Sequence, residues 1–407
     1  MSDPHATPED GGSPALVLAY SNLGHVFTHL FTILYATAVL HLPGVFGLPY
    51  GELLGLASVG LVLYGVAALP AGWLGDRWSQ VGMMVVFFIG TGAGSIVTGL
   101  ASGTAGLFAG LTLIGLFASI YHPVGIAWLV ASVRRQGMTL GFNGVFGSVG
   151  SAVGPVFVGA MIDWVSWRAA FIVPGVLAIG AGALLAYAWW RGLVRDARAD
   201  RVPAPPAGRG AMARVFVILT FTMTCGGFIY SGLTNTMPKL FETGLGPELA
   251  GSYTQIGLYV GAITGAASLS SLLGGWLADR YSPRRVYLAF WLLSVLPVYL
   301  MTTTRDGALL GATLFAMFFH TAYGASENLL VARYTPFRWR ALAYGAKFVL
   351  ALGVGGLAVH LAGKLFDHAG SFDLMYLSFA GFGVLAFASA LLLPRPAPRL
   401  LPAGASA

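Results

Sequence analysis

The feature that most constrains the fold of this chain is an eight-residue string that occurs twice. Residues 72–79 read Gly-Trp-Leu-Gly-Asp-Arg-Trp-Ser, and residues 275–282 read Gly-Trp-Leu-Ala-Asp-Arg-Tyr-Ser. Each copy ends a long apolar segment with an Asp-Arg pair, as expected where a chain leaves a membrane. Because the copies are displaced by half of the 407 residues, they indicate a membrane unit that was duplicated and is used once in each half.

The composition supports a membrane environment. Hydrophobic residues make up 57% of the chain and charged residues only 9%, whereas a soluble chain carries about a quarter charged residues. The 57 glycines suit close packing between helices in a bilayer. The single cysteine excludes an intrachain disulfide.

Twelve apolar segments are each long enough to cross a bilayer as a helix, and far longer than the strands of a membrane barrel. They lie near residues 15–40, 51–74, 81–101, 105–132, 138–161, 167–190, 214–240, 250–276, 284–304, 307–333, 341–366 and 371–394. We therefore predict an all-α membrane protein with 12 transmembrane helices in two pseudo-symmetric six-helix bundles. The predicted units are an N-terminal tail (1–14), a first bundle (15–190), a charged linker (191–213), a second bundle (214–394) and a C-terminal tail (395–407).

The placement of basic residues predicts the orientation. Most of the 22 lysines and arginines, including those of the linker, fall on one side of the predicted membrane. By the positive-inside rule this side is cytoplasmic, so both tails are expected in the cytoplasm and the chain in the cytoplasmic membrane. The net charge of +7 is thus an orientation signal and does not indicate a nucleic-acid partner. No Gly-rich loop ends in Gly-Lys-Ser/Thr and no hydrolase or metalloprotease motif appears, so we expect no nucleotide, no cofactor and no enzymatic activity. We expect a monomer.

Two parallel halves, a charged linker and Gly-x-Leu-x-Asp-Arg after the second helix of each half resemble the major facilitator superfamily. The resemblance covers nearly the whole chain and implies a transporter. In that superfamily the repeated string looks like a cytoplasmic latch of the outward-open state. The second copy matches better, because the first lacks its basic tail; the alternative is that Asp-Arg is only a topological stop signal. The latch role is carried by resemblance to Gly72, Asp76, Arg77, Gly275, Asp279, Arg280 and Arg284.

The fifth predicted helix carries a second resemblance. Its glycines and proline look like the Gly-Pro motif of exporters and antiporters in the superfamily, and they also suit plain helix packing. The motif residues are Gly141, Gly150, Gly154, Pro155 and Gly159. In addition, Gly24-His25 and Tyr121-His122-Pro123 resemble the fosmidomycin-resistance-like group of exporters.

Ionisable residues inside membrane helices are costly and therefore indicate function. Glu327 is the only carboxylate well inside a predicted span, and Lys347 is the only deep ammonium. When the two halves are aligned, Lys347 falls opposite Asn143 and Glu327 falls near His122, so both charges are confined to the second half. Glu327 and Lys347 either form a structural ion pair or take part in proton coupling, and the two readings are compatible.

Polar stripes at helical spacing predict a cavity between the halves. They comprise Asn22, His25 and His29 on the first helix, Asn235 on the seventh, Gln255 and Tyr259 on the eighth, and His320 and Tyr323 on the tenth. Each stripe could instead join helices by hydrogen bonds. The spacing of His25 and His29 suits a metal ion, but no second group of ligands is visible in the sequence, so we predict no metal site.

These observations predict a secondary active transporter of a small organic solute, with proton-coupled export (antiport) of an anionic, zwitterionic or drug-like compound as the leading mechanism. Lys347 and the histidines favour an anionic or zwitterionic solute over a multidrug cation. Proton-coupled uptake of an organic anion is the nearest alternative, and a non-transporting sensor or assembly factor on the same scaffold is another.

Overall fold

The computed structural model describes residues 12–133, 136–197, 209–334 and 349–394. Within these ranges 11 helices are long and apolar enough to cross a membrane, and a bent pair, Tyr50–Val66 with Ala68–Arg77, makes up to 12. The predicted all-α membrane fold is therefore confirmed, and the protein is a multi-pass membrane protein. The expected span 341–366 lies partly outside the described residues.

Helices of the first half succeed one another with short connections. They are α1 (Pro14–Ala38), α2 (Leu42–Phe46), α3 (Tyr50–Gly55), α4 (Ser58–Val66), α5 (Ala68–Arg77), α6 (Gln80–Gly99), α7 (Thr104–Ala118), the π-helical turn η1 (Tyr121–Gly125), α8 (Ile126–Ser132), α9 (Gln136–Trp164) and α10 (Ala169–Trp190).

The second half repeats this order. Its elements are α11 (Arg209–Gly244), α12 (Tyr253–Arg280), α13 (Pro283–Thr303), α14 (Asp306–Ala322), α15 (Gly324–Tyr334), the π-helical turn η2 (Val349–Gly353), α17 (Val354–Ala369) and α18 (Asp373–Leu391). Three predicted spans that lie wholly within the described residues are interrupted where a single helix was expected. The span 307–333 divides at Tyr323 between α14 and α15. The span 51–74 bends by 42° between α4 and α5. The span 105–132 passes through η1, where Pro123 offers no backbone N–H to a regular helix.

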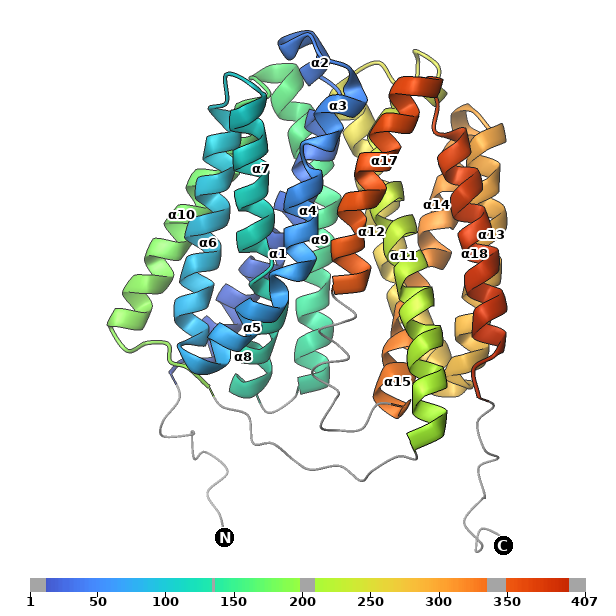
Figure 1. Cartoon of the computed structure of the whole chain (residues 1–407). Coiled ribbons are helices and arrows are strands. Elements are labelled where there is room, and N and C mark those ends of the chain that lie inside the picture. Colours follow the sequence, from blue (N-terminus) through green and yellow to red (C-terminus); the bar gives the residue numbers. More distant parts are fainter. Residues whose placement is uncertain (1–11, 134–135, 198–208, 335–348, 395–407) are drawn as a thin grey trace, which may run out of the picture.

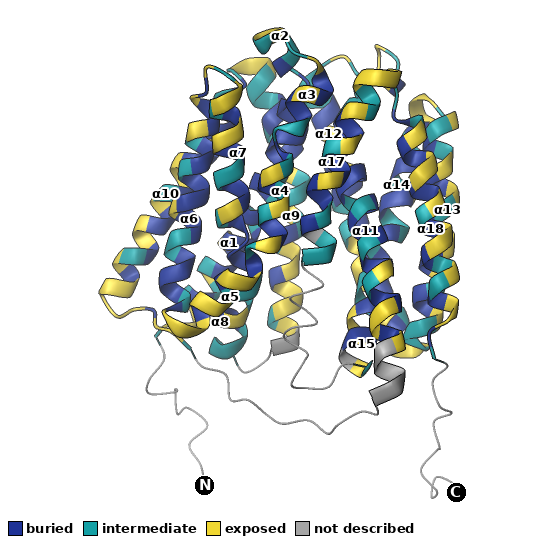
Figure 2. Cartoon of the chain, in the orientation of Figure 1, coloured by how far each residue is buried: buried dark blue, intermediate teal, exposed yellow. Residues whose placement is uncertain are grey.

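The helices form two groups that stand side by side, with α10 at one outer edge and α18 at the other (Figure 1). Exposed residues follow the outer faces, whereas buried residues gather where helices face one another (Figure 2). The exposed side chains include large apolar ones such as Leu184 on α10, Leu272 on α12 and Leu385 on α18. Because the surrounding medium is lipid, these faces need no polar cover.

Contacts across the two halves are made by few helices. α12 packs along α9, α17 packs along α3 and α4, and α1 meets α11. Glycines allow the backbones to touch here: a Cβ at Gly159 would stand 2.2 Å from the carbonyl oxygen of Tyr253, and a Cβ at Gly363 would stand 2.5 Å from that of Gly51. These contacts lie toward the end of the molecule that carries α2, which we call the α2 end (Figure 1). The opposite end carries the repeated Asp-Arg pairs and is called the basic end.

Glycine packing inside one half gives a prediction for stability. A Cβ at Gly115 on α7 would stand 1.9 Å from the carbonyl oxygen of Gly60 on α4, so Gly115→Ala must push the two helices apart. We expect this substitution to lower the free energy of unfolding by roughly 1–3 kcal/mol. Gly180→Ala on α10 is the matched control, since nothing lies within 4 Å of a Cβ there. Thermal unfolding in detergent should separate the two, and equal melting temperatures would contradict this account of the packing.

Candidate functional site

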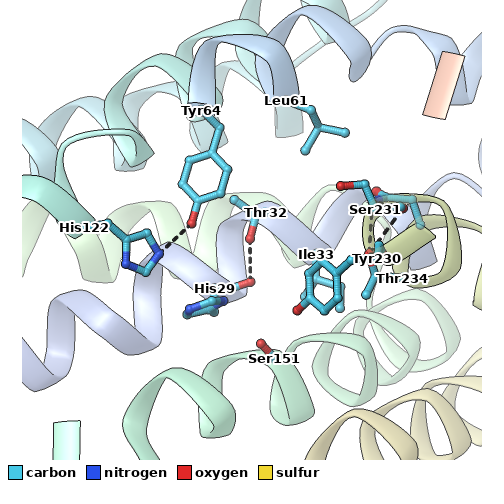
Figure 3. Close-up of a pocket in the computed structure, with 11 residues that line it drawn as sticks. His29, Thr32, Ile33, Leu61, Tyr64, His122, Ser151, Tyr230, Ser231 and Thr234 are labelled. Atoms are coloured by element: carbon cyan, nitrogen blue, oxygen red, sulfur yellow. Dashed lines mark hydrogen bonds between the residues drawn. The ribbon is translucent and has the colours of Figure 1, made fainter. Parts of the chain in front are cut away.

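A cavity of about 130 Å³ lies between the halves. α1, α4, η1 and α9 supply one wall and α11 the other (Figure 3). Of the residues predicted for the site, His29, His122 and Asn235 line this cavity. The other polar lining residues are Thr32, Tyr64, Ser151, Tyr230, Ser231 and Thr234. Hydroxyl, amide and imidazole groups thus face one small space, and no ionised side chain is among the lining residues described.

The first half holds a buried hydrogen-bonded cluster beside the cavity. The amide of Asn143 on α9 donates to the Asn22 side chain on α1 over 2.9 Å, and its oxygen lies 3.1 Å from the hydroxyl of Tyr121. The Nδ1 atom of His25 lies 2.8 Å from the backbone oxygen of Asn143. Asn22, His25 and Asn143, predicted separately from the sequence, therefore meet in one network across α1 and α9.

Three imidazole rings lie against one another at the edge of this network. The ring centroids of His25, His29 and His122 are 5.0, 5.5 and 5.6 Å apart, and one ligand nitrogen of each lies within 4.8 Å of the others. The sequence showed only the α1 pair, and we predicted no metal site because no further ligand was visible. The turn η1 brings His122 from 93 residues farther along the chain, so three potential metal ligands are in fact together.

The second half holds another buried polar cluster, built around Glu327. This carboxylate is 3% exposed and accepts a hydrogen bond of 3.0 Å from the hydroxyl of Tyr287, which lies 2.8 Å from the hydroxyl of Thr222. His320 lies 3.1 Å from the backbone oxygen of Gly226 and 3.2 Å from the Tyr323 hydroxyl. Glu327, His320 and Tyr323 thus belong to one cluster, whereas Lys347 lies outside the described residues.

The cluster around Glu327 is connected to the cavity through aromatic rings. The rings of Tyr287 and Tyr323 are 5.6 Å apart, those of Tyr323 and His320 5.0 Å, and those of His320 and Tyr230 6.3 Å. Tyr230 lines the cavity. The Nδ1 atom of His320 is buried without a hydrogen-bond partner among the described residues.

Two aspartates join the halves at the α2 end, and sequence analysis missed both. Asp163, at the end of α9, accepts hydrogen bonds from the backbone N–H groups of Tyr253 and Thr254 (3.3 and 2.7 Å) at the start of α12. Asp367, on α17, accepts them from Gly51 and Glu52 (2.7 and 3.0 Å) at the start of α3. Each carboxylate satisfies otherwise unpaired N–H groups of a helix in the other half.

A sequence signal for this pair was present. Asp163 and Asp367 are 204 residues apart, and each follows a glycine by four residues, Gly159 in the first half and Gly363 in the second. The alignment of the halves that we used for Lys347 therefore contains a second repeat, Gly-x-x-x-Asp. Both copies lie at the ends of predicted spans, where a carboxylate carries no membrane cost that would mark it as functional.

The repeated Asp-Arg string makes different contacts from those the latch predicts. Asp76 and Asp279 are exposed, and within the described ranges the only ion pair is Lys239–Glu242. Arg77 lies over the Trp73 ring and Arg280 over the Trp276 ring, at 4.5 and 5.1 Å, so both copies use one local cation–π contact. A Cβ at Gly72 would stand 3.2 Å from the Pro123 side chain, and a Cβ at Gly275 would stand 4.0 Å from that of Ala325.

Hydrogen bonds near the end of each string connect the third membrane helix of a half (α6 or α13) to the chain at the end of the sixth (α10 or α18). In the second copy, Arg284 donates to the backbone oxygens of Leu391 and Leu393 at the end of α18 (2.7 and 2.9 Å). In the first copy, which has no basic residue there, the Asp196 carboxylate accepts from Ser79 and from the N–H of Val81 (both 2.9 Å). The two halves thus meet the same structural need with opposite charges, and the latch stays a prediction.

The remaining predicted residues fall outside the cavity. In the Gly-Pro motif, a Cβ at Gly150 or Gly154 would meet α1, and Gly159 and Pro155 lie against α12, whereas Gly141 has open space. The motif therefore supports packing between the fifth helix and two neighbours. Gln255 and Tyr259 hydrogen-bond to each other over 3.4 Å within the first two turns of α12, at the α2 end.

Comparison with known proteins agrees with this architecture. The family model of the Major Facilitator Superfamily matches residues 22–251 and 240–406. The chain belongs to the major facilitator superfamily. This superfamily is one of transporters and not of enzymes, and membership therefore supports a transport role. A solved structure of a bacterial homologue of the human lysosomal transporter Spinster superimposes with a TM-score of 0.76 at 15% identity, covering 94% of this chain and 97% of that one.

Relatives of this superfamily member transport different solutes. The 4-hydroxybenzoate transporter of Pseudomonas putida is 24% identical over 74% of both chains. A probable sulfoacetate transporter of Cupriavidus necator is 24% identical over 81% of this chain and 82% of that one. The tetracenomycin C resistance and export protein of Streptomyces glaucescens is 31% identical over 35% of this chain. The matched segment spans only 26% of the length of that export protein. The fosmidomycin-resistance-like branch stays a prediction.

Proposed function

We propose that the protein moves a small organic anion or zwitterion across the cytoplasmic membrane in exchange for protons. The observation that carries this proposal is Glu327, the only buried carboxylate among the described residues, hydrogen-bonded to Tyr287 and connected by aromatic rings to a cavity between the halves. A carboxylate inside a membrane helix is retained at a cost, and reversible protonation is the function that its chemistry suits best.

The cavity supports a small anionic or zwitterionic solute. A volume of about 130 Å³ is well below the roughly 300–1,000 Å³ of pockets for drug-sized ligands. Its lining offers imidazole, amide and hydroxyl donors and no carboxylate that would repel an anion. The names of two relatives that match at least 74% of the chain, transporters of 4-hydroxybenzoate and sulfoacetate, agree with this class.

We infer that the basic end faces the cytoplasm, since it carries both Asp-Arg pairs and Arg284. The conformer described here, in which Asp163 and Asp367 join the halves at the α2 end, is then the inward-facing one. Alternating access requires helices to slide or rock against their neighbours. The glycines of α9 have no side chains that would interlock with α1 or α12. The resemblance of the Gly-Pro motif in this helix to that of exporters and antiporters favours antiport over uptake.

Reconstitution in liposomes tests the proposal. We would load liposomes at one pH, impose a gradient of one pH unit with the membrane potential clamped, and follow labelled sulfoacetate, a solute whose sulfonate stays ionised. Antiport predicts accumulation only when the lumen is acidic, by up to about tenfold for one proton exchanged per solute, because one pH unit is worth 1.36 kcal/mol. The sign does not depend on the orientation of the protein.

Accumulation with an acidic exterior would instead identify proton-coupled uptake. Protein-free liposomes control for leakage of protonated acids. If no carboxylate or sulfonate in a panel moved, while neutral or cationic solutes of the same size did, the proposed solute class would be wrong.

A further inference from the structure

The three imidazoles beside the cavity have no role in the proposed proton path, which runs through the other half. His25 and His29 stand one turn apart on α1, and η1 places His122 against both. Their nitrogens lie within 4.8 Å of one another. Imidazoles bound to a tetrahedral metal ion at about 2.1 Å lie roughly 3.4 Å apart, so small ring rotations would bring the three onto one ion.

The surroundings of His25 fix which nitrogen is offered. Its Nδ1 lies 2.8 Å from the backbone oxygen of Asn143, which can only accept, so Nδ1 carries the proton and Nε2 carries a lone pair. A backbone carbonyl that holds the second ring nitrogen is the usual outer-shell partner of a metal-binding histidine. The Tyr121 ring stacks on the His25 ring with the centroids 4.9 Å apart, and Gly147 leaves room for the His25 ring against α9.

Gly147 is important for this placement. A Cβ there would stand 2.5 Å from Nε2 and 2.8 Å from each of its two carbon neighbours, which puts it over the ring face and not in the plane of the lone pair. The ring therefore lies flat on the backbone of α9 with the in-plane direction of Nε2 left clear on that side. Any larger residue at position 147 would displace the ring without removing a ligand.

The other two rings face the cavity. His29 and His122 are among its lining residues, and the Nε2 atom of His122 lies 3.0 Å from the Tyr64 hydroxyl, an oxygen that can hold this ring in place (Figure 3). Three histidines with a fourth position open to a cavity is the ligand set of zinc sites that bind and polarise small molecules. Neutral imidazole suits Zn²⁺ and its first-row neighbours, whereas Mg²⁺ and Ca²⁺ need oxygen ligands.

We propose that His25, His29 and His122 bind a divalent transition-metal ion of the Zn²⁺ class, with its open coordination position facing the cavity. The three ligands are neutral, so the bound ion keeps its positive charge and attracts an anion to the cavity. The existence of the site is independent of the proposed function; only the use of the open position by the transported anion rests on it.

Cobalt binding tests the site directly. We would titrate Co²⁺ into the full chain, purified with no histidine tag, and record the visible absorption of tetrahedral Co²⁺. One equivalent should bind, and Zn²⁺ should displace it. His29→Ala and His122→Ala should each weaken binding at least about 100-fold, since loss of an outer-shell partner alone costs 10–100-fold. Gly147→Ala should weaken it about tenfold, and His41→Ala, at the α2 end, should leave it unchanged.

Retained helix content and melting temperature show that the variants fold. Absence of the tetrahedral spectrum in the unmutated protein would overturn the site, as would binding that survives loss of His29 or His122. Neither outcome changes the pH-gradient assay, so the two proposals fail separately. If a metal-stripped protein transported the anion at the same rate as the loaded one, the open position would have no part in solute binding.

Discussion

Glu327→Gln is expected to abolish accumulation driven by a pH gradient while leaving exchange of labelled for unlabelled solute within about twofold of the unmutated protein. Glutamine keeps the shape of the side chain and can still accept the hydrogen bond from Tyr287, but it cannot release a proton. A transporter that cannot deprotonate this position can still change access with solute bound. The tenfold accumulation expected per pH unit should therefore fall to the equilibrium value of one.

Two further variants serve as comparisons for Glu327→Gln. Tyr287→Phe removes the hydroxyl that donates to Glu327, so it should reduce accumulation without abolishing it. Glu52→Gln is the matched control, since Glu52 is exposed at the start of α3, and it should transport normally. Unchanged gradient-driven accumulation in Glu327→Gln would refute the assignment of proton coupling to this residue. Loss of both accumulation and exchange would show a structural role instead.

The second large effect is expected at the α2 end. Replacement of both Asp163 and Asp367 by alanine removes two caps that join the halves. A helix cap is worth about 1 kcal/mol, and a carboxylate near an exposed helix N-terminus adds 0.3–1 kcal/mol. We therefore expect the double variant to favour the conformer with an open α2 end by about 2–4 kcal/mol, a shift of roughly 30-fold or more in the ratio of conformers.

Distances between spin labels should report this shift. Labels at Val45 in the first half and Glu248 in the second, with Cys225 replaced by alanine, span the α2 end. The label separation should lengthen in the double alanine variant, and much less in the double asparagine variant, because asparagine also caps helices well. Asp373→Ala is the control: Asp373 accepts from Ser371 in its own half. Identical distance distributions in all four proteins would contradict a closing role for the two aspartates.

The helical architecture could be predicted from the sequence because it depends on local composition. Apolar runs fix the spans, and the repeated string at residues 72 and 275 fixes the two halves. The bend before Ala68 and the form of the π-helical turn at Tyr121 were not predicted, because the composition of an apolar run does not set the angle or the hydrogen-bond register of a break. Pro123 marked one of these breaks, although not its form.

Residues of the site were easier to predict than their partners. Periodicity placed His25 and His29 on one face of α1, but only the turn η1 shows that His122 joins them. Glu327 was predicted because it is a charged residue inside a span. Tyr287 and Thr222 have no such mark in the sequence, and only the hydrogen bonds in the structure connect them to Glu327. Asp163 and Asp367 were not predicted because a charged residue at the end of a span pays little free energy for membrane insertion and is therefore not a sign of function.

The most direct test of the central claim, proton exchange through Glu327, is to measure proton movement driven by the solute. Liposomes with a trapped pH-sensitive dye and no initial pH gradient would receive external sulfoacetate with the membrane potential clamped. Antiport predicts that the lumen becomes alkaline as the solute enters, and that Glu327→Gln shows no change while exchange persists. A lumen whose pH stays constant in the unmutated protein during solute entry, or one that becomes alkaline equally in Glu327→Gln, would contradict the account.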